Sequence, residues 1–265
     1  MNSAAVDSQA SRIDLNLLRK IWQETKKIPP VGATWRLLRR EYFRAADLQR
    51  RISYIPHHNR IRRQHWNKLQ LGAGKNVLPG WLNTDLHPQE GVLPIDATRP
   101  LPFADNTFEY VVSEHMIEHI SFKEARRMVT EVHRVLRDGG KVRVSTPDFD
   151  FFRGLFRDEL SAAEEEFISW HIKTYNPGYP VLPLSVMNTM FRSWGHQHLY
   201  NEQTLSLLLR QCGFSRIRRY ACGESDDREL QGLEAHGRLV GESNNRMETL
   251  VLEATKDSSS VSSHF

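Results

Sequence analysis

The chain has 265 residues, of which 39% are hydrophobic, and a formal net charge of +4. This length and composition allow one sizeable core plus an accessory segment. They exclude a membrane-spanning helix, because no apolar run approaches the roughly 18 residues that such a helix needs. The N-terminus has no apolar leader region, and Cys212 and Cys222 are too few for a disulfide framework and lack metal-ligand spacing. We therefore expect a cytoplasmic protein.

Positive charge is concentrated near the N-terminus. Residues 12–68 contain fifteen Lys and Arg against four Asp and Glu, an excess of +11. We expect residues 1–66 to form a basic helical extension, with helices over 13–27 and 34–52. The simplest interpretation of the Arg-rich helix 34–52 is a solvated face on a helix that packs against the core. The alternatives are binding to an anionic membrane surface, which would make the protein peripheral to the inner membrane, or, less favoured, to RNA phosphates.

An alternation of strands and helices begins at residue 67 and continues to residue 256. The expected strands cover residues 69–71, 81–84, 91–96, 108–113, 141–145, 217–222 and 248–254, and the expected helices cover 121–136 and 201–212. This order predicts an α/β fold, a Rossmann-like and mostly parallel seven-stranded sheet with flanking helices. Residues 148–195 interrupt the pattern and are expected to form a partly helical lid or substrate insertion after strand five, and residues 257–265 a disordered tail.

Two helix boundaries carry recognisable signals. Ser121 and Glu124 have the spacing of a capping box at the start of the first expected helix. Asp138-Gly139-Gly140 is expected to end that helix in a left-handed conformation. Asn201 is expected to cap the second helix.

A glycine turn and two carboxylates follow the first three strands. Gly72 and Gly74 come directly after the first strand, where missing Cβ atoms let the backbone approach a ligand. Asp85 closes the second strand, where a carboxylate can accept hydrogen bonds from two ribose hydroxyls, and Asp96 follows the third. The pattern predicts a nucleotide-type site at the carboxyl ends of parallel strands. Only about nine residues separate the first two strands, so we expect a turn or loop in place of a crossover helix.

Several further motifs accompany the glycine turn. They are Gly80-Trp-x-Asn-x-Asp85, Asp96 with Leu101-Pro-Phe103, Ser113-Glu-His-x-x-Glu-His119, and Leu136-Arg-Asp-Gly-Gly140. With these motifs the chain resembles the class I S-adenosylmethionine-dependent methyltransferases, in particular the small bacterial predicted methyltransferases. The resemblance is strong over residues 68–146, looser as far as Phe214, and does not include the basic N-terminal segment. It implies S-adenosyl-L-methionine as cofactor.

The resemblance assigns cofactor binding to Leu71, Gly72, Gly74, Asp85, Leu86, Asp96, Ala97, Ser113 and Glu114. The glycine backbone would meet the methionine portion, Asp85 the ribose diol, and Asp96 the adenine amino group with Ala97 beside the ring. A turn acid or helix cap is the simpler role for either aspartate. Because the glycine turn is short, the assignment of Gly74 depends on how Pro79-Gly80 is placed.

Histidines supply the candidate acceptor-side residues. A hydroxyl acceptor needs a base, and histidine titrates near neutrality. We expect His115 and His198 to be catalytic, and His119, Trp194 and His196 to bind substrate. The alternative for these histidines is packing or hydrogen bonding that holds loops in place.

His115-x-x-Glu-His119 also matches the inverted zinc-peptidase signature. We reject that interpretation, because the motif follows a strand of a cofactor-binding sheet and no third ligand accompanies it. Some quinone-type O-methyltransferases bind a divalent ion at a similar Glu-x-x-Glu-His sequence, but His115 here occupies the first Glu position. We therefore expect no metal.

The expected activity is O-methylation of a small-molecule or saccharide-type acceptor. One alternative is an RNA methyltransferase that uses the basic N-terminal helices. The other is a non-catalytic module that binds S-adenosylmethionine. No Asn/Asp-Pro-Pro-aromatic tetrad follows the fourth strand, which argues against methylation of adenine N6 in nucleic acids.

Overall fold

A computed structural model describes residues 65–87 and 89–257. All of them belong to the second of the two units into which the chain divides, His58–Phe265. The predicted helices over 13–27 and 34–52, with their proposed membrane or RNA contacts, lie outside the described residues. Among the described residues, no helix is long and apolar enough to cross a membrane.

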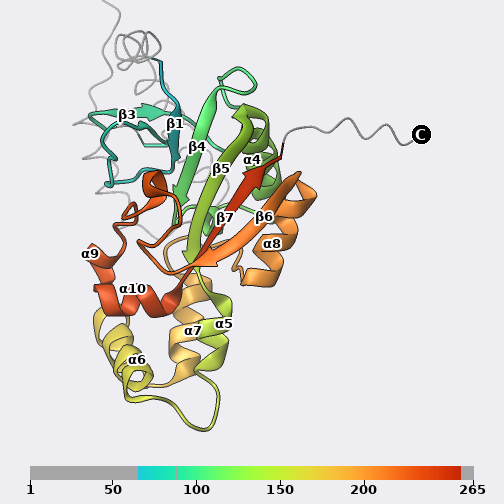
Figure 1. Cartoon of the computed structure of the whole chain (residues 1–265). Helices are drawn as coiled ribbons and strands as arrows, with labels where there is room; N and C mark the ends of the chain where they lie inside the picture. The colour runs from blue at the N-terminus through green and yellow to red at the C-terminus, as the bar shows by residue number, and fades with distance from the viewer. Residues whose placement is uncertain (1–64, 88, 258–265) are drawn as a thin grey trace, which may run out of the picture. The chain divides into compact units, whose positions relative to one another are not determined.

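The described residues form one seven-stranded sheet in the order β3-β2-β1-β4-β5-β7-β6 (Figure 1). Its strands are β1 (Lys68–Leu71), β2 (Leu82–Asp85), β3 (Val92–Pro94), β4 (Phe108–Glu114), β5 (Leu136–Pro147), β6 (Phe214–Tyr220) and β7 (Thr249–Lys256). β7 runs antiparallel to β5 and β6, and the pairs among β1 to β5 are parallel. The expected fold class is confirmed.

The connection between β1 and β2 contains no helix, as expected from its length. Residues 72–81 form turns and extended backbone, and Ala73 N donates to Thr84 O at 2.9 Å. Asn83 fixes the second half of the connection, because its side chain accepts from Leu78 N and donates to the carbonyls of Leu78 and Trp81. The short connection leaves one face of the sheet without its usual helix.

Helices α4 (Phe122–Val135) and α8 (Glu202–Gln211) cover the other face of the sheet. The capping boxes at Ser121 and Asn201 are both present, so these two predicted starts are confirmed. The predicted last residue of α4, Leu136, is one residue too late, and the predicted left-handed ending at Asp138-Gly139-Gly140 is wrong. The helix stops at Val135 because Leu136 turns extended, pairs with Phe108 and is fully buried in the core. Gly139 does adopt a left-handed φ of 78°, but inside β5.

The face that lacks a helix is covered by residues 221–237, which we call the strap. It leaves β6 at the same sheet edge at which β4 and β5 end, and it contains the short 3₁₀ helix η2 (Arg228–Leu230). Leu230 is fully buried in a cluster with Leu78, Trp81 and Val112. The sequence analysis did not anticipate the strap. It continues into the short helices α9 (Gly237–Val240) and α10 (Glu242–Glu248).

A buried arginine anchors the strap to the sheet. Arg143 of β5 is 0% exposed, and its guanidinium lies 2.5 Å from both Glu234 of the strap and Glu253 of β7. It also donates to the carbonyl oxygen of Glu224 at 2.8 Å. A buried guanidinium needs such partners, because an unpaired buried charge costs several kcal/mol.

Residues 148–194 form three helices beyond the carboxyl ends of β4 and β5, below their arrowheads in Figure 1. These helices are α5 (Phe149–Gly154), α6 (Ala162–Tyr175) and α7 (Pro183–Arg192), and we call them the lid helices. They have a core of their own, with Phe152, Phe167 and Ile172 almost completely buried. The lid helices therefore stand at the sheet edge at which we expect the site.

Candidate functional site

The glycine turn after β1 has the geometry that only glycine adopts easily. Gly72 has φ +70°, and a Cβ there would lie 2.5 Å from Met116 Cγ. Gly74 has φ +50°, and a Cβ there would meet nothing within 4 Å. Gly72 therefore serves close packing between the turn and the segment after β4, whereas Gly74 faces open space at which a ligand can approach its backbone.

Asp85 lies at the end of β2 and already holds the glycine turn. Its Oδ2 accepts from Gly74 N at 2.9 Å, and its Oδ1 accepts from His87 N at 2.7 Å. Gln89 reinforces the turn with a hydrogen bond to Gly74 O. A carboxylate has about four acceptor positions, so two remain for ribose hydroxyls. The carboxylate and the open glycine turn thus fit the ribose and methionine portions of S-adenosylmethionine.

Asp96 organises a turn. Thr98 donates to its Oδ1 through both N, at 3.0 Å, and Oγ1, at 2.6 Å, and Arg99 Nε donates to its Oδ2 at 3.0 Å. Burial alone would raise its pKa, but these donors prevail and lower the pKa. The structure thus shows the turn role directly, while adenine binding by Asp96 stays a prediction.

The remaining predicted cofactor residues differ in accessibility. The side chain of Leu71 is fully buried in the core, Leu86 is exposed, and Ala97 packs partly buried against the core. Ser113 is buried at the end of β4, and its hydroxyl makes no hydrogen bond among the described residues.

Glu114 joins the strap to the glycine turn. Its Oε1 accepts from the backbone N of Ala235 at 2.6 Å and of His236 at 2.7 Å, and its Oε2 accepts from Asn76 Nδ2 at 3.0 Å. Asn76 also donates to Leu233 O at 3.0 Å. The strap is therefore a wall of the candidate cofactor site. Sequence reasoning missed this wall, because residues 221–237 carry no motif and no regular apolar period.

His115 follows β4 directly, and both its ring nitrogens and one face of its ring contact other side chains. Its φ of +43° is rare for a residue with a side chain. Its Nε2 lies 3.1 Å from Thr249 Oγ1, its Nδ1 lies 3.3 Å from Glu118 Oε1, and its ring stacks on His236 with centroids 3.9 Å apart. Both ring nitrogens thus have protein partners, and the predicted catalytic role of His115 stays a prediction.

The residues predicted to act on the acceptor gather around Glu118, to which the sequence analysis gave no role. Glu118 lies in the 3₁₀ helix η1 (Ile117–His119), is 1% exposed, and its Oε2 accepts from Thr146 Oγ1 at 3.0 Å. Burial opposes the charge on both Glu118 and His115. Their mutual attraction prevails, lowering the pKa of Glu118 and raising that of His115. The first signal for Glu118 was its place in the His-x-x-Glu-His motif.

The chain that leaves α7 returns beside η1 and brings the predicted substrate residues together. Gln197 N and His198 N donate to Glu118 O at 2.7 and 3.2 Å, and Gln197 Nε2 donates to His119 O at 2.7 Å. The rings of His119 and His196 then lie 4.9 Å apart, and Trp194 lies 5.6 Å from His196. His119 is 75 or more positions away in the sequence from Trp194 and His196, and the fold brings them together.

His198 lies on the same returning segment. Its ring contacts Phe122 and Tyr200, at centroid distances of 5.3 and 4.6 Å. Burial lowers its pKa, so the ring is neutral near pH 7. A neutral imidazole can accept a proton.

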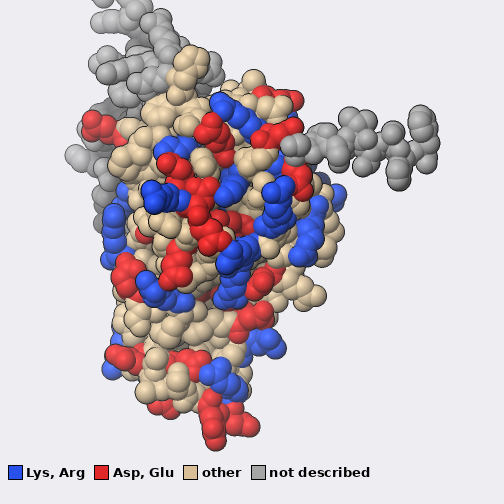
Figure 2. Space-filling model, in the orientation of Figure 1, with Lys and Arg blue, Asp and Glu red and all other residues tan. Residues whose placement is uncertain are grey.

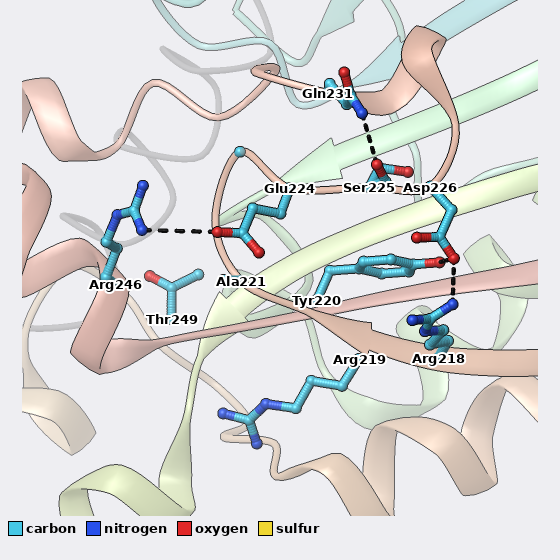
Figure 3. Close-up of a pocket in the computed structure, with 11 residues that line it drawn as sticks. Arg218, Arg219, Tyr220, Ala221, Glu224, Ser225, Asp226, Gln231, Arg246 and Thr249 are labelled. Carbon is cyan, nitrogen blue, oxygen red and sulfur yellow. Dashed lines mark hydrogen bonds and ion pairs between the residues drawn. The ribbon is translucent and has the colours of Figure 1, made fainter.

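Charges on the face that carries β6 and the strap are mutually paired. Figure 2 shows basic and acidic side chains interleaved over the middle of this face. A hollow of about 740 Å³ lies there. In Figure 3, Arg218 points to Asp226 and Arg246 to Glu224. The third arginine of the hollow, Arg219, pairs with Asp148 at 2.7 Å. The hollow contains none of the predicted site residues, and its arginines already have carboxylate partners.

Comparison with known proteins identifies one matching domain. Residues 81–144 match the family model described as a methyltransferase domain. No curated protein matches the chain. A methyltransferase structure from Thermotoga maritima has 16% identity over 72% of this chain and 82% of its own, with a TM-score of 0.43. One from Archaeoglobus fulgidus has 14% identity over 83% and 99%, with a TM-score of 0.42.

A phosphoethanolamine N-methyltransferase from Haemonchus contortus, crystallised with S-adenosyl-L-methionine, has 16% identity over 72% of this chain and 48% of its own, with a TM-score of 0.38. This chain therefore corresponds to about half of that protein. Residues 81–144 therefore match a methyltransferase domain, and the seven-stranded sheet and the carboxylate after β2 agree with S-adenosyl-L-methionine as its cofactor.

Proposed function

We propose that the protein transfers a methyl group from S-adenosylmethionine to a hydroxyl oxygen of a small-molecule or saccharide-type acceptor. One observation carries the proposal. The segment after α7 is hydrogen-bonded to η1, so His196 and His198 lie beside the carboxyl end of β4. This edge of the sheet also presents the glycine turn and Asp85, at which the cofactor would bind.

Different residues of the chain bind the cofactor and orient the acceptor. Gly74 and Asp85 hold the cofactor, and the clasp of Glu114 with Ala235 and His236 keeps the strap closed beside it. When bound, the cofactor supplies a methyl group on a positively charged sulfur. Alignment of the acceptor with that methyl group is then the main task of the protein.

A hydroxyl acceptor must also lose its proton. A lone pair of the acceptor oxygen forms the new O–C bond, while the C–S bond breaks and its electrons stay on sulfur, which gives S-adenosylhomocysteine. We assign the proton to His198, which is neutral near pH 7 and whose ring nitrogens make no hydrogen bond that we observe among the described residues. General-base assistance of this kind contributes about 10²- to 10⁴-fold to rate.

The test is a methyl-transfer assay with isotope-labelled S-adenosylmethionine against a panel of hydroxyl, amine and RNA acceptors. We expect transfer to a hydroxyl acceptor, and a loss of kcat of at least about 100-fold in His198→Ala with little change in cofactor affinity. His65→Ala is the matched control, because His65 is exposed and precedes β1 at the opposite edge of the sheet. Transfer only to amines or RNA would refute the oxygen acceptor. Cofactor binding without turnover on any acceptor would favour a non-catalytic module.

A further inference from the structure

We propose that Glu118, His119 and His196 form a site for one divalent cation of the zinc type. The sequence led us to expect no metal, because His115 occupies the first Glu position of the Glu-x-x-Glu-His sequence. The fold supplies a different ligand, His196, from the segment after α7. The existence of the site is independent of the proposed function, whereas its use in binding the acceptor rests on it.

The three side chains already converge. One ligand atom from each lies within 4.8 Å of the others. Glu118 is 1% exposed, its Oε2 is fixed by Thr146, and its Oε1 has only a long contact, to His115 Nδ1 at 3.3 Å. Its Oε1 lies 4.0 Å from His119 Nε2. A buried carboxylate oxygen is costly unless it is well paired, and a bound cation would pair it more closely than this long contact does.

The tautomer of His196 is set for metal binding. Its Nδ1 lies 2.8 Å from Met190 O, which can only accept a hydrogen bond. Nδ1 must therefore carry the proton, and Nε2 keeps a free lone pair. A backbone carbonyl on one ring nitrogen is the usual way in which proteins orient a histidine toward a metal on the other.

Two imidazoles and one carboxylate are a ligand set of catalytic zinc sites, which keep a further position open. Zinc bonds of about 2.0–2.2 Å place tetrahedral ligand atoms about 3.4 Å apart. The separations of up to 4.8 Å must therefore close by about 1.4 Å. His119, with 37% of its side chain exposed, has room to rotate inward.

The open position indicates how the acceptor would bind. A hydroxyl oxygen on the cation becomes more acidic, because the positive charge stabilises its anion. The proposed acceptor is therefore one whose reacting hydroxyl can bind to the cation from the side of the exposed Trp194. His198 lies on the same segment but contacts Phe122 and Tyr200, outside the three-ligand group.

The direct test is equilibrium dialysis of the full chain against buffered Zn²⁺, with the bound metal measured by mass spectrometry. Titration with Co²⁺, whose visible bands report coordination, is the second readout. We expect one tightly bound ion per chain. Glu118→Gln and His196→Ala should bind it at least about 100-fold more weakly, because loss of an outer-shell partner alone costs about 10- to 100-fold. His198→Ala is the matched control and should retain the ion.

Circular dichroism and thermal unfolding without metal will show whether each variant folds. Equal Zn²⁺ uptake by the wild type and both folded ligand variants, or no uptake by the wild type, would overturn the site. In either case His115 would simply neutralise Glu118. The two proposals fail separately. An intact metal site without methyl transfer refutes only the function, and full transfer by dialysed, metal-free protein refutes only the metal's role in it.

Discussion

Asp85 offers the sharpest test of the cofactor site. Truncation to alanine removes the only carboxylate at the end of β2 and two hydrogen bonds, from Gly74 N at 2.9 Å and His87 N at 2.7 Å. A hydrogen bond to a charged group contributes about 1.5–3 kcal/mol. Loss of one ribose contact therefore predicts at least about tenfold weaker binding, and loss of both about 150-fold or more.

Isothermal titration of S-adenosylmethionine and S-adenosylhomocysteine into wild type and Asp85→Ala measures this loss. Both ligands carry the same ribose, so both should lose affinity by the same factor. Asp85→Asn keeps one acceptor oxygen and should fall between the two proteins. The exposed Glu90→Ala, nearby in the chain, should bind like the wild type.

Two results would refute the reasoning. A change below about threefold in Asp85→Ala would mean that the carboxylate only holds the glycine turn. A much larger loss for S-adenosylmethionine than for S-adenosylhomocysteine would mean that Asp85 acts through the sulfonium charge, because a ribose contact cannot tell the two ligands apart.

Three further predictions concern stability. Burial lowers the pKa of His171 to about 4, and the negative charge of Glu248 opposes this shift. As the pH falls, the unfolded chain therefore binds a proton on this residue before the folded chain does. The stability that is present above pH 6.5 is lost as the pH falls toward 4. Urea unfolding should show about 1.4 kcal/mol less stability at pH 5.5 than at pH 7.5 from this group, a difference absent in His171→Phe. Gly72→Ala combines a left-handed φ with a clash against Met116 Cγ and should cost about 2–4 kcal/mol in the same assay; an unchanged midpoint would contradict that geometry. Leu230→Ala should cost about 2–5 kcal/mol because the residue is fully buried under the strap, whereas the 77% exposed Leu239→Ala should stay within about 0.5 kcal/mol; equal effects would argue against the strap as part of the core.

The sequence by itself determined the succession of strands along the chain and the starts of two helices. These features depend on neighbours in the chain. Short apolar runs indicate strands of the parallel sheet, the Ser121–Glu124 capping box starts α4, and Asn201 starts α8. The ten-residue gap between β1 and β2 was enough to predict that no crossover helix fits there.

Contacts between distant segments could not be predicted in this way. Nothing in residues 221–237 indicates that they cover the sheet face that the short β1–β2 connection leaves open. Leu230 packs under the strap, and Arg143 anchors it, through partners more than 80 residues away in the sequence. The sequence also proposed His119 and His196 for one site without a means of joining them. Only the tertiary structure placed both histidines beside the buried Glu118, because there the segment after α7 is hydrogen-bonded to η1. The pattern of residues along one sequence carries no information on which loops contact each other.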